Sequence, residues 1–130
     1  MTGQDNAEII RAGYEAFAKG DIPAVVAVWA DDIAWHIPGR SPLAGDYSGA
    51  QEVLGFFAQL QERSEGSFRL ELHDVTASDD HVVALVREIG HRGDKSLNGL
   101  GAHIWHLRDG KATEFWGMTA DSYAADEFWS

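Results

Sequence analysis

Cysteine is absent from this sequence of 130 residues. Its absence excludes disulfide bonds, thiolate metal sites and a cysteine nucleophile, and it leaves the redox compartment undecided. No apolar run approaches the roughly 18 residues of a membrane-spanning helix. The first ten residues, MTGQDNAEII, lack the basic and then apolar blocks of a secretory signal. These features predict a cytoplasmic protein.

Positive charge is also scarce. Ten Lys and Arg residues stand against 21 Asp and Glu residues, which gives a formal net charge of −11. Such a chain repels polyanions, so nucleic acid is excluded as a partner. Apolar residues make up 45% of the chain, as in an ordinary soluble domain. The length predicts a single domain over residues 1–130.

The strongest local signal lies in residues 103–121, where two apolar-rich runs flank Asp109 and Gly110. An Asp-Gly pair between such runs is typical of a β-hairpin with a two-residue loop, because Gly tolerates the positive φ of a type I′ turn. Each strand of this hairpin mixes aromatic rings with titratable groups. A pocket wall needs that mixture, whereas a plain half-buried sheet does not.

The register of this hairpin decides which side chains share a face. With a two-residue loop, Trp105 lies opposite Glu114 and His103 lies opposite Trp116, and opposite residues share a face. A loop one residue longer would instead place Phe115 beside His103, since a one-residue slip exchanges the two faces of a strand. We take the two-residue loop as the expected register.

Three helices are expected before most of the strands. Apolar residues recur at helical spacing from about Asp5, which fits a capping box with Glu8, to a stop at Gly20. Asp21 is placed to cap a second, short helix, and Ser48 to cap a third helix with an apolar stripe. The first two helices should form a helical hairpin.

The strands follow a different period. Residues 33–37 predict one short strand, and residues 38–49 predict an irregular loop. From residue 67 onward the apolar residues alternate, which predicts a meander of four long antiparallel strands that the short strand joins. Asp121 is placed to cap a last short helix. Helices on one side of an antiparallel sheet make an α+β fold, and a curved sheet of this kind encloses a cone-shaped cavity.

The order of elements resembles the nuclear-transport-factor-two-like superfamily. The segments YEAFAKGD, VWADDIAWHIPGRSPLAGDYSG and HIWHLRDGKATEFW are similar to its SnoaL-like polyketide-cyclase and ketosteroid-isomerase-like branch, and the resemblance spans roughly residues 7–125. It implies a curved antiparallel sheet wrapped around N-terminal helices to form a cone-shaped pocket. The superfamily hosts isomerases, cyclases, dehydratases and epoxide hydrolases, together with ligand-binding and protein-binding domains that catalyse nothing.

The catalytic residues of the family transfer only in part. Steroid isomerases place a general-base Asp immediately before the Pro that ends the first strand, and Ile37 stands at that position here. Steroid isomerisation by the usual residues is therefore not expected. Cyclases of the family place a carboxylate near the end of the last strand, where Asp121 is the nearest candidate, although it serves equally well as a helix cap. His36 and His103 are similar to the paired pocket histidines of scytalone-dehydratase-like enzymes.

The chemistry expected of such a pocket is proton transfer without a cofactor. A buried neutral imidazole of His36 or His103 can take a proton and return it elsewhere. A hydroxyl or indole N–H from Tyr14 or Trp105 would stabilise a developing enolate. The expected catalytic residues are thus His36, His103, Tyr14 and Asp121. The expected substrate-binding residues are aromatic: Trp35, Phe57, Trp105, Phe115 and Trp116.

A metal site is not expected, because His103 and His106 are three apart on one strand and point to opposite faces. The ligand is expected to be a small hydrophobic metabolite, and a homodimer is expected because exposed aromatic rows imply an interface. The alternative is a binding module of the same fold without turnover. A cavity faced by both His36 and His103 favours an enzyme, whereas a cavity filled by Trp105, Trp116 and Phe57 favours a binding or structural role.

Overall fold

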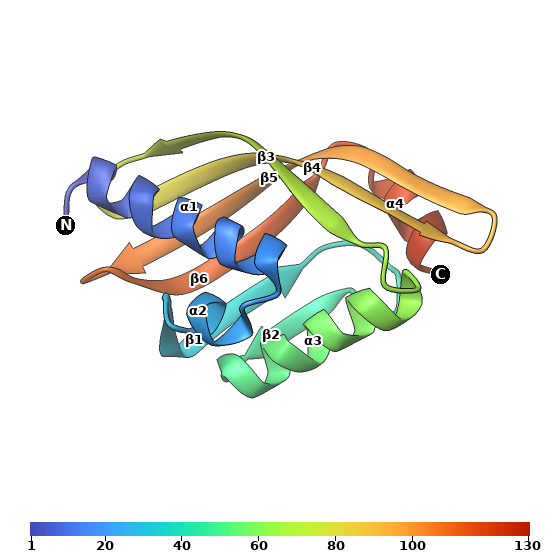
Figure 1. The fold of residues 1–130 in the computed structure, drawn as a ribbon, viewed down its shortest axis with the longest axis horizontal. Coiled ribbons are helices and arrows are strands. Elements are labelled where there is room, and N and C mark those ends of the chain that lie inside the picture. The colour runs from blue at the N-terminus through green and yellow to red at the C-terminus, as the bar shows by residue number, and fades with distance from the viewer.

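The computed structural model describes all of residues 1–130 and forms a curved six-stranded sheet with helices against it (Figure 1). Along the sheet the strands follow the order β2-β1-β6-β5-β4-β3. The strands are β1 Trp29–Ile37, β2 Gly45–Ser48, β3 Arg69–Ala77, β4 His81–Arg92, β5 Lys95–Arg108 and β6 Lys111–Thr119. The helices are α1 Gly3–Lys19, α2 Ile22–Val26, α3 Gly49–Arg63 and α4 Ser122–Trp129. This arrangement confirms the predicted α+β fold.

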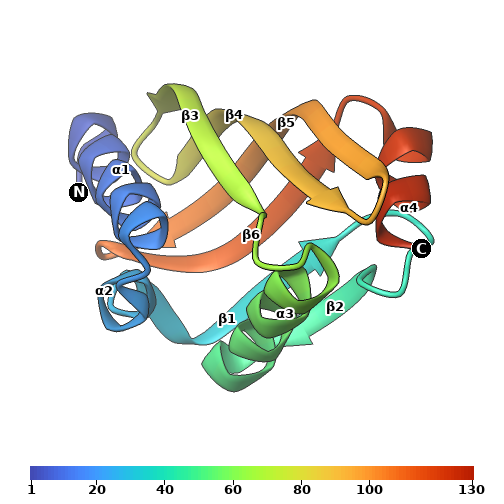
Figure 2. The same cartoon turned by 45° about the vertical axis from the view of Figure 1, so that its right-hand side comes forward.

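The meander of β3 to β6 is antiparallel throughout, and β1 joins it by parallel pairing with β6. In Figure 2 the long strands bend, with α1, α2 and α3 on one face of the sheet and α4 beyond one end of it. We call the face that turns toward α1 and α3 the inner face, and the opposite face the outer face. None of the helices is both long and apolar enough to cross a membrane.

Helix α1 begins one turn earlier than its predicted cap. Thr2 is the N-cap, and its side chain and that of Asp5 bond to each other's backbone N–H groups in a complete capping box. The expected pairing of Asp5 with Glu8 is therefore wrong, because Asp5 occupies the third helical position and not the cap. At the other end, Gly20 adopts a left-handed conformation with φ 73°, as a helix stop requires.

Two strand boundaries differ from the sequence prediction, because residues outside the predicted strands also form backbone pairs in the sheet. Helix α2, capped by Asp21, ends at Val26, and Trp29 already begins β1. Residues 45–48, predicted as loop, pair with β1 as the edge strand β2, with Tyr47 opposite Trp35. An edge strand of four residues needs only backbone pairing on one side, so its sequence carries little alternation.

The β5–β6 hairpin contains the predicted turn but not the predicted register. Asp109 and Gly110 both have positive φ, at 51° and 77°, as a type I′ turn requires. Beyond the turn the register shifts between His106 and Leu107, so that Trp105 lies opposite Phe115 and not Glu114. In the structure His103 and Phe115 therefore share a face, as the alternative with a longer loop predicted. The cause of the shift is a β-bulge, because the loop itself has two residues.

The physical reason for the bulge is the spacing of two buried side chains on β6. Ala112 and Phe115 are 0% and 3% exposed, yet residues three apart on a regular strand point to opposite faces. One extra residue between them, at Thr113, brings both side chains to the inner face. The same shift turns Glu114 and Trp116 to the outer face, which keeps a carboxylate out of the core.

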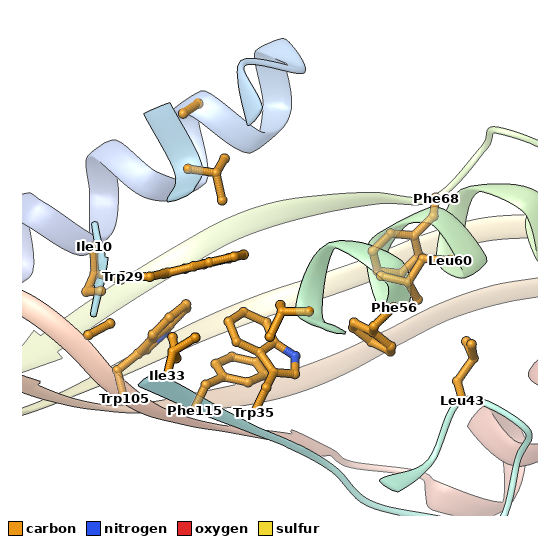
Figure 3. Close-up of a cluster of buried hydrophobic side chains, with 14 of the residues drawn as sticks. Ile10, Trp29, Ile33, Trp35, Leu43, Phe56, Leu60, Phe68, Trp105 and Phe115 are labelled. Carbon is orange, nitrogen blue, oxygen red and sulfur yellow. The ribbon is translucent and has the colours of Figure 1, made fainter. Parts of the chain in front are cut away.

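The core lies between the inner face and the helices. Figure 3 shows Trp35, Trp105 and Phe115 standing on the sheet close to Trp29, while Phe56 lies toward the far side of the cluster. The rings of Trp35 and Phe115 stack with centroids 3.8 Å apart. Large rigid rings that pack against one another cannot rearrange freely, so they can line a cavity without filling it.

Candidate functional site

A cavity of about 130 Å³ opens between the inner face and the helices. Eighteen of the 26 residues that line it are hydrophobic. Its wall includes six of the nine predicted site residues, and its aromatic members include Phe17, Trp29, Trp35, Phe57, Trp105 and Phe115. Because these rings line the cavity without filling it, the space is shaped for a small apolar ligand.

Three polar side chains meet in this apolar wall. The hydroxyl of Tyr14, on α1, lies 2.5 Å from Nδ1 of His103, on β5. The indole Nε1–H of Trp105, two residues further along β5, donates to the same hydroxyl oxygen over 3.2 Å. Positions 103 and 105 share the inner face because strand side chains alternate. We call these three residues the polar triad.

Burial sets the charge state of the polar triad. It lowers the pKa of His103 to about 4, because the charged imidazolium loses its water. It also raises the pKa of Tyr14 above its ordinary value, with the hydrogen bond from Trp105 acting against the shift. At neutral pH both groups are therefore uncharged.

The hydrogen-bond pattern assigns the proton on His103. Since Trp105 donates to the Tyr14 oxygen, the Tyr14 hydroxyl is free to donate its own hydrogen to Nδ1 of His103. A neutral imidazole that accepts at Nδ1 carries its proton on Nε2. The Nε2–H is the one donor of the polar triad that the triad leaves unused, and the ring lines the cavity. The arrangement can therefore donate a hydrogen bond to a bound ligand.

A further titratable group in the cavity wall, Glu88, was not predicted from the sequence. Glu88, on β4, lines the same wall, and burial raises the pKa of its carboxyl to about 7. The signal was present in the sequence, because Glu88 continues the alternation of the buried Val82, Ala84 and Val86. Because residues 82–86 are all apolar, the sequence alone does not show which of them alternate toward the core.

His36 does not face the cavity, so the expected pair of pocket histidines is not formed. Its ring nitrogens lie 2.6 Å from carboxylate oxygens of Asp46 and Glu114 on the outer face. Those hydrogen bonds, to Asp46 first, raise the pKa of His36. The parallel pairing of β1 with β6 places His36 beside Trp116, and the two rings stack with centroids 5.3 Å apart. Trp116 therefore lies outside the cavity as well.

Asp121 also lies outside the residues that line the cavity. Its Oδ1 accepts a hydrogen bond from the backbone N–H of Ala124 over 3.0 Å, so it caps α4 as the alternative interpretation held. Of the expected site residues, the structure brings six together at the cavity: Tyr14, Trp35, Phe57, His103, Trp105 and Phe115. No three His, Asp or Glu side chains are arranged to hold a metal ion.

Comparison with known proteins agrees with the architecture. Residues 10–115 match a family model described as a SnoaL-like domain. The protein Rv0034 of Mycobacterium tuberculosis is 28% identical over 131 aligned residues, covering 100% of both chains. Bal32a, from a soil-derived mobile gene cassette, superposes with a TM-score of 0.94 at 32% identity and 98% coverage of each chain. TerC, co-crystallised with polyporic acid, superposes with a TM-score of 0.85 at 26% identity, covering 95% of this chain and 97% of TerC.

Proposed function

Because this chain belongs to the SnoaL-like domain family, we propose that it is a cofactor-independent enzyme that catalyses proton transfer on a small hydrophobic ketone. The family includes small-molecule-binding proteins and proteins of the isomerase and cyclase type. The observation that carries the proposal is the polar triad, which leaves one N–H unused on an imidazole ring that lines an apolar cavity. The co-crystal of TerC with polyporic acid supports a small organic ligand.

In this proposal His103 stabilises negative charge. Its Nε2–H donates to the carbonyl oxygen of the ligand, and this bond strengthens as the oxygen becomes an enolate. Such a donor in a site that excludes water is worth on the order of 3 kcal/mol in the barrier. Tyr14 and Trp105 hold the imidazole in the donating tautomer, so both are positioning residues. The expected role of His103 as a base is thereby replaced by a role as a donor.

The size of the cavity bounds the ligand. A volume of about 130 Å³ is close to that of an engineered apolar cavity of about 150 Å³ that accepts benzene. One ring therefore fits in the enclosed part, and a fused second ring would extend toward the mouth. The aromatic wall favours a planar ligand, because flat rings stack and meet edge to face without strain.

The experiment follows exchange of the acidic C–H groups of 2-indanone in D₂O by proton NMR. We expect the wild-type protein to accelerate exchange over buffer, and His103→Ala to lower the rate by about 100-fold or more. His73→Ala is the matched control, since His73 is exposed on β3, and it should exchange at the wild-type rate. A wild-type protein that binds the ketone without accelerating exchange would contradict the proposal.

That last outcome would support the second candidate function, a ligand-binding module without turnover. The lining favours this alternative in one respect, because 18 of the 26 lining residues are hydrophobic and offer no chemistry. A single N–H donor would then serve to orient a ligand. Saturable binding of 2-indanone with no exchange, seen also at high protein concentration, distinguishes it from the enzyme.

A further inference from the structure

We propose that Glu88 is the catalytic base and acid of this site, taking a proton from the ligand and returning it while His103 holds the ligand oxygen. This inference rests on the proposed function and deepens it, because it makes the substrate a ketone with a removable proton beside the carbonyl. The sequence patterns of the family did not indicate Glu88. The inference comes from its position, its surroundings and its lack of a protein partner.

The strand register places the Glu88 carboxylate beside the polar triad. Glu88 is paired with Gly99 of β5, and both Gly101 and His103 follow on the same inner face. A Cβ atom at position 101 would lie 2.7 Å from Oε1 of Glu88, so the carboxylate occupies the space that a side chain at Gly101 would take. Positions 101 and 103 are about 7 Å apart along the strand. The carboxylate and the imidazole thus flank one region of the cavity.

Glu88 also differs from the other carboxylate of the cavity wall. Oδ1 of Asp126, on α4, accepts hydrogen bonds from the backbone N–H groups of Arg40 and Ser41 over 3.0 and 3.2 Å, and so holds a loop. For Glu88, burial is the only cause of its altered pKa, with no hydrogen bond or ion pair contributing. Glu88 is half-buried, and without a protein partner its carboxylate is free to meet a proton of a bound ligand.

The groups around Glu88 suit it to proton exchange near neutral pH. The remaining titratable residues that line the cavity are Tyr14 of α1, His103 of β5 and Asp126 of α4. Tyr14 and His103 are uncharged at neutral pH, so neither fixes the charge of Glu88. A pKa of about 7 lets the carboxyl accept and release a proton with similar ease, which is the optimum for general acid–base catalysis.

The step balances without an oxidant, a reductant or a further reactant. A Glu88 carboxylate oxygen takes a proton from the carbon next to the ligand carbonyl. The electron pair of that C–H bond forms a C=C bond, and the π pair of the carbonyl moves onto its oxygen, which accepts a hydrogen bond from Nε2–H of His103. The protonated Glu88 then returns the proton to the same carbon or to another carbon conjugated with it.

The test compares Glu88→Gln with the wild type in the exchange of 2-indanone in D₂O. Gln keeps the shape of Glu but cannot carry the proton, so we expect the rate to fall by about 100-fold or more. The dissociation constant of 2-indanone should change less than about threefold, because Glu88 acts on the transition state. Glu88→Asp should recover part of the rate. Glu15→Gln, at an exposed position on α1, is the matched control and should leave the rate unchanged.

The pH profile separates a catalytic Glu88 from a merely structural one. Wild-type exchange should rise with pH and level off above about 7, as the carboxyl ionises, and Glu88→Gln should lose that rise. An active wild type that needs His103 but tolerates Glu88→Gln within about threefold overturns the assignment of Glu88 and leaves the proposed function standing. A wild type that does not accelerate exchange overturns both.

Discussion

At the scale of single residues, the two faces of one sheet give the same side chain opposite properties. His103, on the inner face, has a pKa lowered to about 4 by burial. His36, on the outer face, has a raised pKa because Asp46 and Glu114 bond to its ring. The sequence shows two histidines in aromatic surroundings and cannot distinguish them, because the difference depends on which neighbours the register supplies.

The lowered pKa of His103 predicts an acid-sensitive contribution to stability. Between the ordinary value of 6.5 and about 4, the unfolded chain binds a proton that the folded chain does not. The contribution is therefore complete above pH 6.5 and is lost as the pH falls toward 4. A shift of this size corresponds to about 3 kcal/mol, at 1.36 kcal/mol for each pKa unit.

We expect His103→Gln to remove this part of the pH dependence. The free energy of unfolding, measured in urea at pH 7 and pH 4.5, should fall less in the variant than in the wild type, by roughly 2 kcal/mol. Glu88 titrates in both proteins, so its opposite contribution cancels in the comparison. Equal falls in the two proteins would show that folding does not lower the pKa of His103, contrary to this prediction.

At the scale of elements, local signals predicted most of the chain. Capping residues and apolar periods located the helices, and Asp109 with Gly110 located the hairpin turn correctly. The turn residues could not predict the bulge in β6. The bulge depends on the burial of both Ala112 and Phe115 in the core, which forms only when the helices pack against the sheet. The positions of Phe115 and Trp116 relative to the cavity depended on that one residue.

Deletion of Thr113 tests the bulge directly. Without the extra residue, the pairs Leu107–Ala112 and His106–Glu114 become neighbours in a regular ladder, so Phe115 stays on the inner face opposite Trp105. We therefore expect the deletion variant to keep a cooperative thermal transition and its near-ultraviolet circular dichroism. Thr113→Ala keeps the residue count and should fold with a loss of no more than about 1 kcal/mol. A deletion variant that loses its cooperative transition while Thr113→Ala keeps it would refute this account.

At the scale of the whole molecule, the order of periods along the chain predicted the α+β fold, and the resemblance of the element order and of three segments to known families indicated the family. The structure and the family match confirm both predictions. Fold follows from many weak signals that agree, so a single error in register does not disturb it. The site follows from a few residues in one place. Tyr14, His103 and Trp105 were predicted as site residues, whereas His36 was misplaced and Glu88 was missed.

The outer face predicts how copies of the molecule associate. Leu85, Leu100 and Met118 are large apolar side chains that are 40%, 54% and 45% exposed, and they lie on the neighbouring strands β4, β5 and β6. With a net charge of −11, two copies repel each other except where apolar surface brings them together. We propose that a second copy covers this face in a homodimer.

The proposed homodimer is tested by measuring the molar mass of the protein in solution, with light scattering during size-exclusion chromatography. We expect the wild type to be dimeric at micromolar concentration and Leu100→Glu to be monomeric, because a carboxylate there would be buried without a partner. Tyr123→Glu, at a position that is 89% exposed on α4, is the control and should stay dimeric. A monomeric wild type would rule out the proposed homodimer.

The alternation of side chains along β1, β5 and β6 has an evolutionary consequence. Trp35, His103 and Phe115 reach the ligand space, while their immediate neighbours in the chain reach the opposite surface. Drift at one set of codons can therefore change the cavity wall while the outer face is preserved, and drift at the other set can do the reverse. Away from the bulge at Thr113, an inserted or deleted codon would exchange the two sets, so lineages of this fold should diversify here by substitution and keep the lengths of these strands.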